Sequence, residues 1–527
     1  MNNTAPTRSS QSPPEAILER WQQARQRRTN WDAHWQECYD YALPQRDSQL
    51  SNASPGGKRT DKLFDGTACD AVDQLAASLL SQLTPPWARW FGLTPGPDAD
   101  EAERELMADS LERAAQALQS NFDRSNFAIE VHQCYLDLVT AGTACLMFEE
   151  APAGEPSAFR FMAVPLSQVA FEENAFGQLD TTFRRSELTT AQLRQRFPDA
   201  VLTESSARNS QASELKIVVI EAVIRETQGF TYQAITEPCP ATDGKSISLA
   251  CGKFERSPFI NFRWIKAPGE IYGRSPVMKA LPDIKTANKV VELVLKNATI
   301  AVTGIWQADD DGVLNPATIS LVPGTIIPKA VGSAGLTPLE TPGRFDVSQM
   351  VLTDLRQRIR HALLADKLGQ PDSPKMSATE VVERSVEMAR LLGATHGRLQ
   401  SELLTPLFAR ALAILKRRGE VDDLHVDGRL IDLEYKSPLA REQAKLDARN
   451  TLMWIESISS MGEEARSVVD FAAAARWLGR SFGVPQELIL EQPEGLDGED
   501  QMELGEDMVS ELMDLPPTLV EETVDGI

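Results

Sequence analysis

SATEVVERSVEMARLLGATHGRLQSELLTPLFARALAILKRRG occupies residues 377–419 of the chain. Its first four residues have the form of a capping box, in which Ser377 and Glu380 satisfy free backbone donors at the start of a helix. Pro406 predicts a kink, and Gly419 is a residue type at which helices commonly end. We therefore expect one long kinked helix within residues 377–420.

A helix, a β-rich segment and a second helix are expected before this stretch. Residues 281–302 carry apolar side chains at steps of three and four, which predicts a helix with one apolar face. Residues 303–345 are rich in Gly, Pro, Thr and Ile and predict a small β-rich module. A returning helix is expected over 346–366, and two prolines predict a loop over 367–376. The apolar stripe of the first helix comprises Ile284, Ala287, Val291, Val294, Ala298 and Ala301.

The first 280 residues predict a mixed body of helices and strands, so the expected fold class is α+β. Residues 1–14 are rich in Ser, Thr and Pro and are expected to be disordered. Residues 438–480 are expected to be mainly helical. Periodicity predicts helices at 14–43, 67–83, 98–120 and 126–139. Strands are predicted at 143–149, 158–164, 181–185, 214–226, 230–236 and 258–265.

The charge of the chain is acidic and unevenly distributed. The sequence has 76 acidic and 53 basic residues, so its net charge of -23 is unlike that of a free-standing nucleic-acid-binding protein. Residues 486–527 contain fourteen Asp and Glu and no Lys or Arg, and without them the net charge is -9. We expect these residues to form a solvated, mobile acidic tail.

The sequence lacks the usual signals of catalysis and of ligand binding. Gly244-Lys245-Ser246 is the nearest approach to a nucleotide-binding loop, but Cys239 stands where the motif requires its first glycine. Five scattered histidines show no zinc-ligand spacing, and six cysteines form no CxxC pair and are expected to be free thiols. We expect no enzymatic activity, no cofactor, no metal and, without a long apolar run, no membrane span.

Residues 377–419 resemble a segment of the head-to-tail connector (portal) family of short-tailed bacteriophages, the podovirus type. Glu270–Pro276 resembles the family's E-x-YGRSP turn, and Tyr435–Ala440 and Tyr41–Pro44 resemble two further segments. Four such pieces in order, from about residue 20 to about residue 480, are more specific than any one alone. The motif residues are Tyr272, Gly273, Arg274, Ser275, Pro276, Ala378, Thr379, Glu380, Arg398, Leu399, Gln400, Glu402 and Pro406.

These motifs also have a purely structural interpretation. Gly273 suits a tight turn, and Pro276 suits the first position of a helix. The segment around Pro406 suits a packed, kinked helix. In a portal subunit we expect such residues to build the fold rather than to perform chemistry.

The resemblance implies a portal fold with an α+β wing, a two-helix stem, a small β-rich clip, a long kinked helix and a helical crown. The implied parts are a disordered N-terminus at 1–14, the wing at 15–280, the first stem helix at 281–302, the clip at 303–345, the second stem helix at 346–366, the tunnel loop at 367–376, the long helix at 377–420, the crown at 421–485 and the acidic tail at 486–527.

The resemblance also implies a function. A portal subunit forms a ring, expected to be a dodecamer, at one capsid vertex of the virion, and double-stranded DNA passes through it without sequence specificity during packaging and ejection. The implied partners are the major capsid and scaffolding proteins, the terminase large subunit and then a tail adaptor protein. The chain is expected to be made in the host cytoplasm.

Two sets of residues are candidates for contacts in such a ring. A channel that lets a polyanion slide should carry only a few basic belts, since each phosphate contact adds affinity. The apolar stripe 284–301 is the candidate contact between neighbouring stems, and salt bridges or a solvated helix face are the alternative roles of the basic residues. The candidate channel residues are Lys285, Lys289, Lys296, Arg356, Arg360, Lys367 and Lys375.

Two other classes of protein remain as alternatives. The first is another structural part of a virion, such as a tail adaptor or an internal ejection protein, against which the order of helix, clip, helix, loop and kinked helix argues. The second is an enzyme of the packaging machine, against which the missing phosphate-binding loop argues.

Overall fold

A computed structural model shows two compact units, residues 1–437 and 438–527. Each unit is treated by itself. The structure describes residues 12–46, 57, 59–86, 89–96, 101–198, 200, 216–239, 244–303, 306–308, 336–338, 345–365, 393–421, 431–435, 438–459 and 469–482.

Four helices precede the three-stranded sheet. They are α1 (Pro14–Ala42), α2 (Thr67–Leu83), α3 (Glu101–Asp123) and α4 (Phe127–Ala141), close to the four predicted ranges. Pro14 occupies the first turn of α1, where a missing N–H costs nothing, and Gly142 ends α4 in the left-handed conformation. The N-terminal stretch predicted to be disordered lies, up to residue 11, outside the described residues.

The two larger antiparallel sheets form most of the β part of the first unit. The three-stranded sheet has the order β3 (Phe159–Val164), β2 (Thr143–Glu150), β9 (Phe259–Arg263). The five-stranded sheet has the order β4 (Val169–Glu173), β5 (Leu179–Thr189), β6 (Lys216–Arg225), β7 (Phe230–Thr236), β8 (Ser248–Phe254). The six predicted strands are all present, while β4, β8 and the short helix α5 (Thr190–Arg196) were not predicted. These elements confirm the α+β class.

Helices pack on the three-stranded sheet and complete the main core. Helix α4 contacts both β2 and β3, and α12 (Thr405–Arg418) delivers Phe408 to the same core. Phe408 lies 4.4 Å from Phe91 between ring centroids. Phe91 belongs to β1 (Phe91–Pro95), which pairs with β12 (Ile431–Tyr435), so two segments far apart in sequence close the core together.

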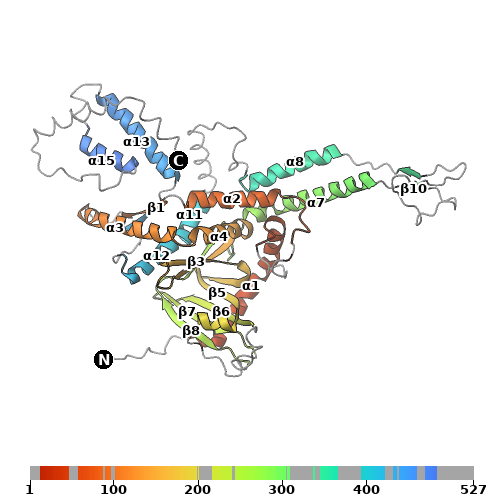
Figure 1. Cartoon of the computed structure of the whole chain (residues 1–527), viewed down its shortest axis with the longest axis horizontal. Coiled ribbons are helices and arrows are strands. Elements are labelled where there is room, and N and C mark those ends of the chain that lie inside the picture. The colour runs from red at the N-terminus through yellow and green to blue at the C-terminus, as the bar shows by residue number, and fades with distance from the viewer. Residues whose placement is uncertain are drawn as a thin grey trace, which may run out of the picture. The chain divides into compact units, whose positions relative to one another are not determined.

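A long helix pair leaves this core. Figure 1 shows α7 (Pro276–Thr303) and α8 (Phe345–Ala362) side by side, with β10 (Trp306–Ala308) near their far ends. Strand β10 pairs with β11 (Leu336–Pro338), and the rest of the β-rich module predicted over 303–345 lies outside the described residues. Helix α7 begins five residues before the range predicted from periodicity because Pro276 starts it. Helix α8 ends at Ala362, four residues before the predicted end, and Leu364 adopts a positive φ of 58°.

The described part of the long helix consists of three segments. Helix α11 (Gly393–Leu399) leads into a π-helix (Gln400–Leu404), which leads into α12. Gly419 ends α12 with a φ of 72°, as predicted. The capping-box residues Ala378, Thr379 and Glu380 and the loop with Lys367 and Lys375 lie outside the described residues.

The second unit is described through two helices, α13 (Pro438–Ser459) and α15 (Phe471–Phe482), which contact each other. Both fall in the region predicted to be mainly helical. The acidic tail 486–527 lies outside the described residues.

Candidate functional site

The turn at residues 270–276 brings two backbone segments into direct contact. Gly273 N–H donates to Thr143 Oγ1 at 2.8 Å, and a Cβ at Gly273 would overlap the carbonyl oxygen of Gly142. Gly142 has a φ of 77°, and a Cβ there would in turn overlap the carbonyl oxygen of Gly273. Both positions therefore need glycine, and the turn is fixed against the end of α4.

Tyr272 anchors the same turn in an aromatic cluster. Its ring lies edge-on to Trp35 at 5.0 Å and close to Trp31 and Phe171. The Phe171 N–H donates to its hydroxyl at 3.4 Å. Burial raises the pKa of Tyr272 to about 12, so the phenol stays neutral and has a packing role.

The end of the turn starts α7. Ser275 Oγ donates to Thr140 O at 2.8 Å and accepts from Met278 N–H at 2.9 Å, as an N-cap residue does. Arg274 lies over the Trp31 ring at 5.1 Å and pairs with Glu270. The turn therefore sets the direction in which α7 leaves the core.

Arg263 connects two motif segments of the first unit, the 270–276 turn and the segment around Glu402. This side chain is only 1% exposed. Its Nη2 donates to Glu402 Oε1 at 2.7 Å, its backbone N–H donates to Glu402 Oε2 at 2.9 Å, and its Nη1 donates to Ile271 O at 2.9 Å. Arg398 Nη1 also donates to Glu402, at 3.0 Å. The 270–276 turn and the 398–406 segment thus share one buried guanidinium.

The π-helix places Glu402 opposite Arg263. Pro406 has no N–H to donate to the Glu402 carbonyl, and its ring disfavours regular α geometry there. Thr405 N–H donates instead to Gln400 O, and Thr405 Oγ1 reaches the same oxygen at 3.0 Å. The irregularity predicted at Pro406 is therefore a π-turn, while Leu399 packs in the core and Gln400 stays exposed.

A buried carboxylate, that of Asp65, joins the ends of α7 and α8 that lie nearest the core. Asp65 Oδ2 accepts from Arg356 Nε at 2.8 Å, and its Oδ1 accepts from Thr67 N–H at 3.0 Å. Asn288 on α7 accepts from the backbone N–H groups of Phe64 and Asp65. Burial opposes the charge, but the hydrogen bonds outweigh it and hold the pKa of Asp65 below its ordinary value of 3.8. The loop before α2 thus joins both helices.

The apolar stripe of α7 divides into two parts. Ile284 and Ala287 are buried in the same core cluster as Leu355 and Ile359 of α8. Because this burial occurs within one chain, these two residues stabilise the subunit itself, and the contact of the stripe with a neighbouring subunit stays a prediction. Val291, Val294 and Ala298 are half-buried, and the side chain of Ala301 is outside the described set.

The candidate channel residues are mostly paired within the chain. Lys285 pairs with Glu37 at 3.3 Å, Lys289 and Lys296 pair with Glu292 at 2.9 and 2.6 Å, and Arg356 pairs with Asp65. Arg360 is exposed and makes no ion pair with another described residue. Of the described candidates, Arg360 therefore retains the clearest capacity to contact a phosphate.

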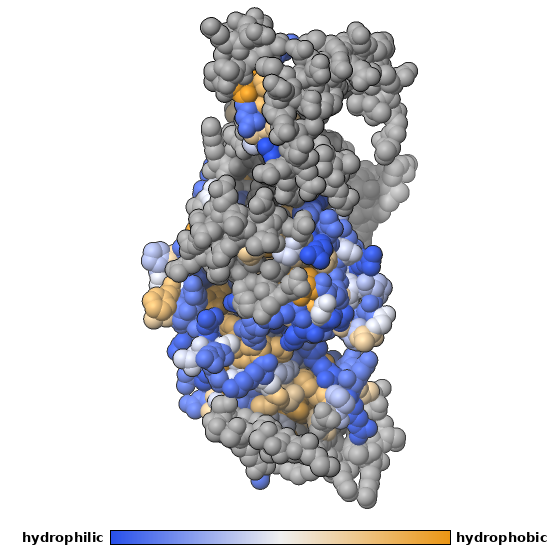
Figure 2. Space-filling model, turned by 90° about the vertical axis from the view of Figure 1, so that its left-hand side faces the viewer, coloured by the Kyte–Doolittle hydropathy of each residue, from blue (hydrophilic) through white to orange (hydrophobic). Residues whose placement is uncertain are grey.

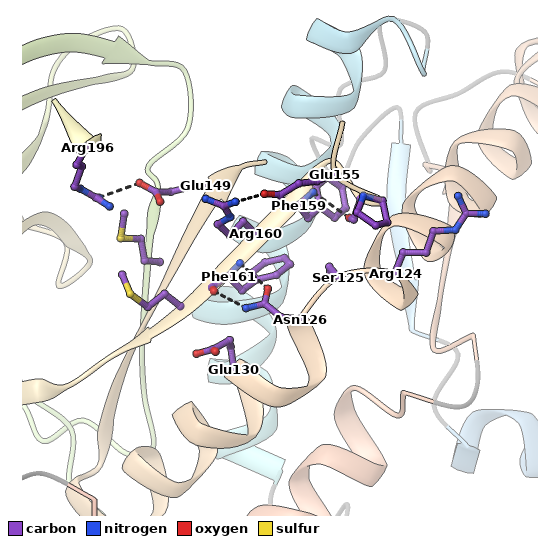
Figure 3. Close-up of a pocket in the computed structure, with 14 residues that line it drawn as sticks. Arg124, Ser125, Asn126, Glu130, Glu149, Glu155, Phe159, Arg160, Phe161 and Arg196 are labelled. Atoms are coloured by element: carbon purple, nitrogen blue, oxygen red, sulfur yellow. Dashed lines mark hydrogen bonds and ion pairs between the residues drawn. The ribbon is translucent and has the colours of Figure 1, made fainter. Parts of the chain in front are cut away.

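A cavity of about 490 Å³ lies beside α4 and β3 (Figure 3). Arg196 pairs there with Glu149 at 3.0 Å, and Arg160 pairs with Glu155. Asn126 Nδ2 donates to Phe161 O at 2.8 Å across its wall. Four of the charged side chains that line this cavity are therefore held in ion pairs within the chain.

Metal clusters and membrane spans were also sought among the described residues. No three His, Cys, Asp or Glu side chains there come together in a group that could hold a metal ion. No described helix is both long and apolar enough to cross a membrane.

Three residues of the site were not predicted from the sequence. Arg263 lies in a strand that was predicted, but the pattern of apolar and polar residues along that strand does not indicate a buried ion pair. Asp65 and Asn288 act through partners more than 200 positions away. A charged residue within an otherwise apolar strand, as in FINFRW, is the one local signal that could have indicated Arg263.

Related proteins are found over most of the length of the chain. The chain is 25% identical to the probable portal protein of Bordetella phage BPP-1 over 92% of this chain and 90% of that protein. It is 24% identical to the portal protein of Salmonella phage epsilon15, over 91% and 89%, and 20% identical to that of Escherichia phage T7, over 75% and 74%.

A chain in the solved virion of a native gene transfer agent particle is 13% identical, with a TM-score of 0.35, and the match covers 80% of this chain and 93% of that one. The family described as bacteriophage head to tail connecting protein matches residues 14–490, and the chain belongs to that family.

Proposed function

We propose that this chain is a portal subunit of a bacteriophage virion, which forms a ring at one capsid vertex and provides the channel through which the genome enters and leaves. The observation that carries the proposal is the family match over residues 14–490, together with relatives named as portal proteins over most of their lengths. Helices α7 and α8 would form the stem of this ring, and the paired strands β10 and β11 would belong to its clip.

The finer parts of the proposal concern partners. A ring of twelve subunits would meet the major capsid and scaffolding proteins in the capsid. The clip, around β10 and β11, would present the docking surface for the terminase large subunit and later for a tail adaptor protein. The two ion pairs in the cavity and the neutral, buried Tyr272 support a structural role rather than an enzymatic one.

The channel part of the proposal now rests on fewer basic residues. Arg356 holds Asp65, and Lys285, Lys289 and Lys296 have carboxylate partners on their own chain. Arg360 remains the described candidate for non-specific contact with double-stranded DNA. Lys367 and Lys375 remain candidates on the expected tunnel loop.

Negative-stain electron microscopy of the purified full chain, with mass photometry alongside, tests the ring. We expect particles with a central channel and a mass near twelve subunits. A compact closed dimer without a channel at all concentrations would contradict the proposal. ATP hydrolysis by the pure protein would favour an enzyme of the packaging machine instead.

A further inference from the structure

The outer face of α7 carries an apolar side chain next to a charged one. Leu293 lies nine residues after the buried Ile284, which is half a turn around the helix, and it is 49% exposed. Lys296 follows three residues later on the same face and is 64% exposed. Lys289 lies one turn earlier. This face is therefore an exposed leucine flanked by lysines.

The outer face of α8 carries the complementary arrangement. Met350 is 75% exposed, the highest exposure of a large apolar side chain on either helix in the described residues. Asp354 lies four residues later, so both side chains project from one face. Asp354 is exposed and forms no ion pair with any other described residue. This face is an exposed methionine beside a free carboxylate.

The two faces lie at similar distances from the hairpin ends of their helices. Helix α7 ends at Thr303 and α8 begins at Phe345, and the β10–β11 hairpin lies between them. At 1.5 Å per residue, Lys296 lies about 10 Å and Leu293 about 15 Å from that end, while Met350 lies about 8 Å and Asp354 about 14 Å from it. Since a rotation about a ring axis keeps heights unchanged, these faces can meet between neighbouring copies.

Figure 2 shows another face of the molecule, on which hydrophilic residues surround smaller hydrophobic areas. On the helix pair, the exposed Leu293 of α7 lies beside a lysine and the exposed Met350 of α8 lies beside an aspartate. A closed ring needs two different, complementary faces on each subunit, which is what α7 and α8 offer.

We propose that the occupant of these faces is a second copy of this chain: the Leu293–Lys296 face of α7 packs against the Met350–Asp354 face of α8 in the adjacent subunit. This inference rests on the proposed ring. Lys296 then lies between Glu292 of its own chain, at 2.6 Å, and Asp354 of the neighbour. Lys296 is thereby a residue of subunit assembly, and the DNA channel does not depend on it.

Cysteine cross-linking tests the contact directly. The full chain carrying Lys296→Cys and Asp354→Cys, with the accessible Cys69, Cys239 and Cys251 replaced by Ser, is treated with a short bismaleimide and resolved on a denaturing gel. We expect a ladder of dimers, trimers and higher species, because each subunit offers two different faces. Either single-cysteine variant should give no ladder. Dimers from one single-cysteine variant would indicate that like faces meet and would overturn the proposal.

A charge exchange tests the pairing. Lys296→Glu alone and Asp354→Lys alone should each lower the assembly constant of rings by about tenfold at low ionic strength, and the double variant should recover most of the loss. Lys253→Glu is the matched control, since Lys253 is 66% exposed and also paired with a glutamate, but on β8. Circular dichroism checks that each variant folds.

The outcomes separate this inference from the proposed function. Wild-type rings without a ladder, or single variants that assemble like the wild type, would overturn the contact and leave the portal proposal intact. A double variant no better than either single one would also overturn the pairing. Wild-type protein that forms no ring at any concentration would count against both.

Discussion

The guanidinium of Arg263 and the carboxylate of Glu402, 139 positions apart, form a buried pair with three donors on one acid: the backbone N–H, Nε and Nη2 of the same arginine. Because the arginine also binds Ile271 O and Gly177 O, the pair fixes a strand, two turns and a helix together. Because the Arg263 side chain is only 1% exposed, water cannot solvate its charge, and the charge depends on these protein partners.

Removing this arginine should destabilise the subunit strongly. Arg263→Met leaves Glu402 without its main partner and removes a donor from the Ile271 and Gly177 carbonyl groups, so we expect a loss of about 3 to 5 kcal/mol in the free energy of unfolding. Arg358→Met, which breaks an exposed pair with Asp283, should cost no more than about 1 kcal/mol. Chemical denaturation measures both variants. Equal losses would show that burial of Arg263 is not what matters.

The contact of Gly142 with Gly273 predicts a steric effect of a single methyl group. Gly273→Ala forces its Cβ into the Gly142 carbonyl and to within 2.9 Å of the Arg263 Cβ, and overpacking of this kind costs about 1 to 3 kcal/mol. Gly397→Ala, inside α11 with open space around it, should instead be neutral or stabilising. Thermal unfolding compares the two variants. A tolerated Gly273→Ala would mean that the turn can move away from α4.

Asp65 predicts a dependence of stability on pH. Its folded-state pKa lies below 3.8, so the stability it contributes is present above that value and is lost as pH falls through the lower folded-state pKa. Arg356→Gln removes one of the groups that lower this pKa, so the acid unfolding midpoint should move to higher pH. Acid titration followed by circular dichroism measures the midpoint. Arg358→Gln is the control, and an equal shift there would argue against a specific role of Asp65.

Arg360 predicts a change in DNA binding that leaves stability intact. If assembled rings bind DNA through Arg360, Arg360→Gln should weaken binding of short duplexes and lower the salt-dependence slope by about 0.9 for each phosphate that the protein no longer neutralises. Unfolding midpoints should stay at the wild-type value because the side chain is exposed. Binding isotherms at several salt concentrations measure the slope, and Lys253→Gln serves as the control. An unchanged slope would remove Arg360 from the channel.

Local signals predicted most of the helices and strands. Helix α2 matches the predicted range 67–83 because an Ala- and Leu-rich periodic run ends before Pro85. Strand β8 was missed because SLACGKF contains small and polar residues with little β-propensity pattern. Strand β1 was missed because its partner is β12, and pairing across such a separation leaves no local trace.

The candidate site was harder to predict for a related reason. The stripe on α7 showed that one face is apolar, but periodicity cannot tell whether that face meets α8 of the same chain or another subunit. In the structure, Ile284 and Ala287 pack in the same core cluster as Leu355 and Ile359 of α8. The exposed Leu293 was not part of the stripe, since a single leucine between lysines has no periodic signal.

The pairing of β1 with β12 has a consequence for biosynthesis. Ile431 follows its partner Pro95 by 336 positions. At 5 to 20 residues per second, the ribosome delivers the second strand roughly 20 to 70 seconds after the first. Phe408, which packs against Phe91 in the aromatic core, follows it by 317 positions and is also translated late. The nascent chain must therefore carry an open strand edge through most of its translation, and a newly made subunit becomes competent to join a ring only after nearly all of it has left the ribosome.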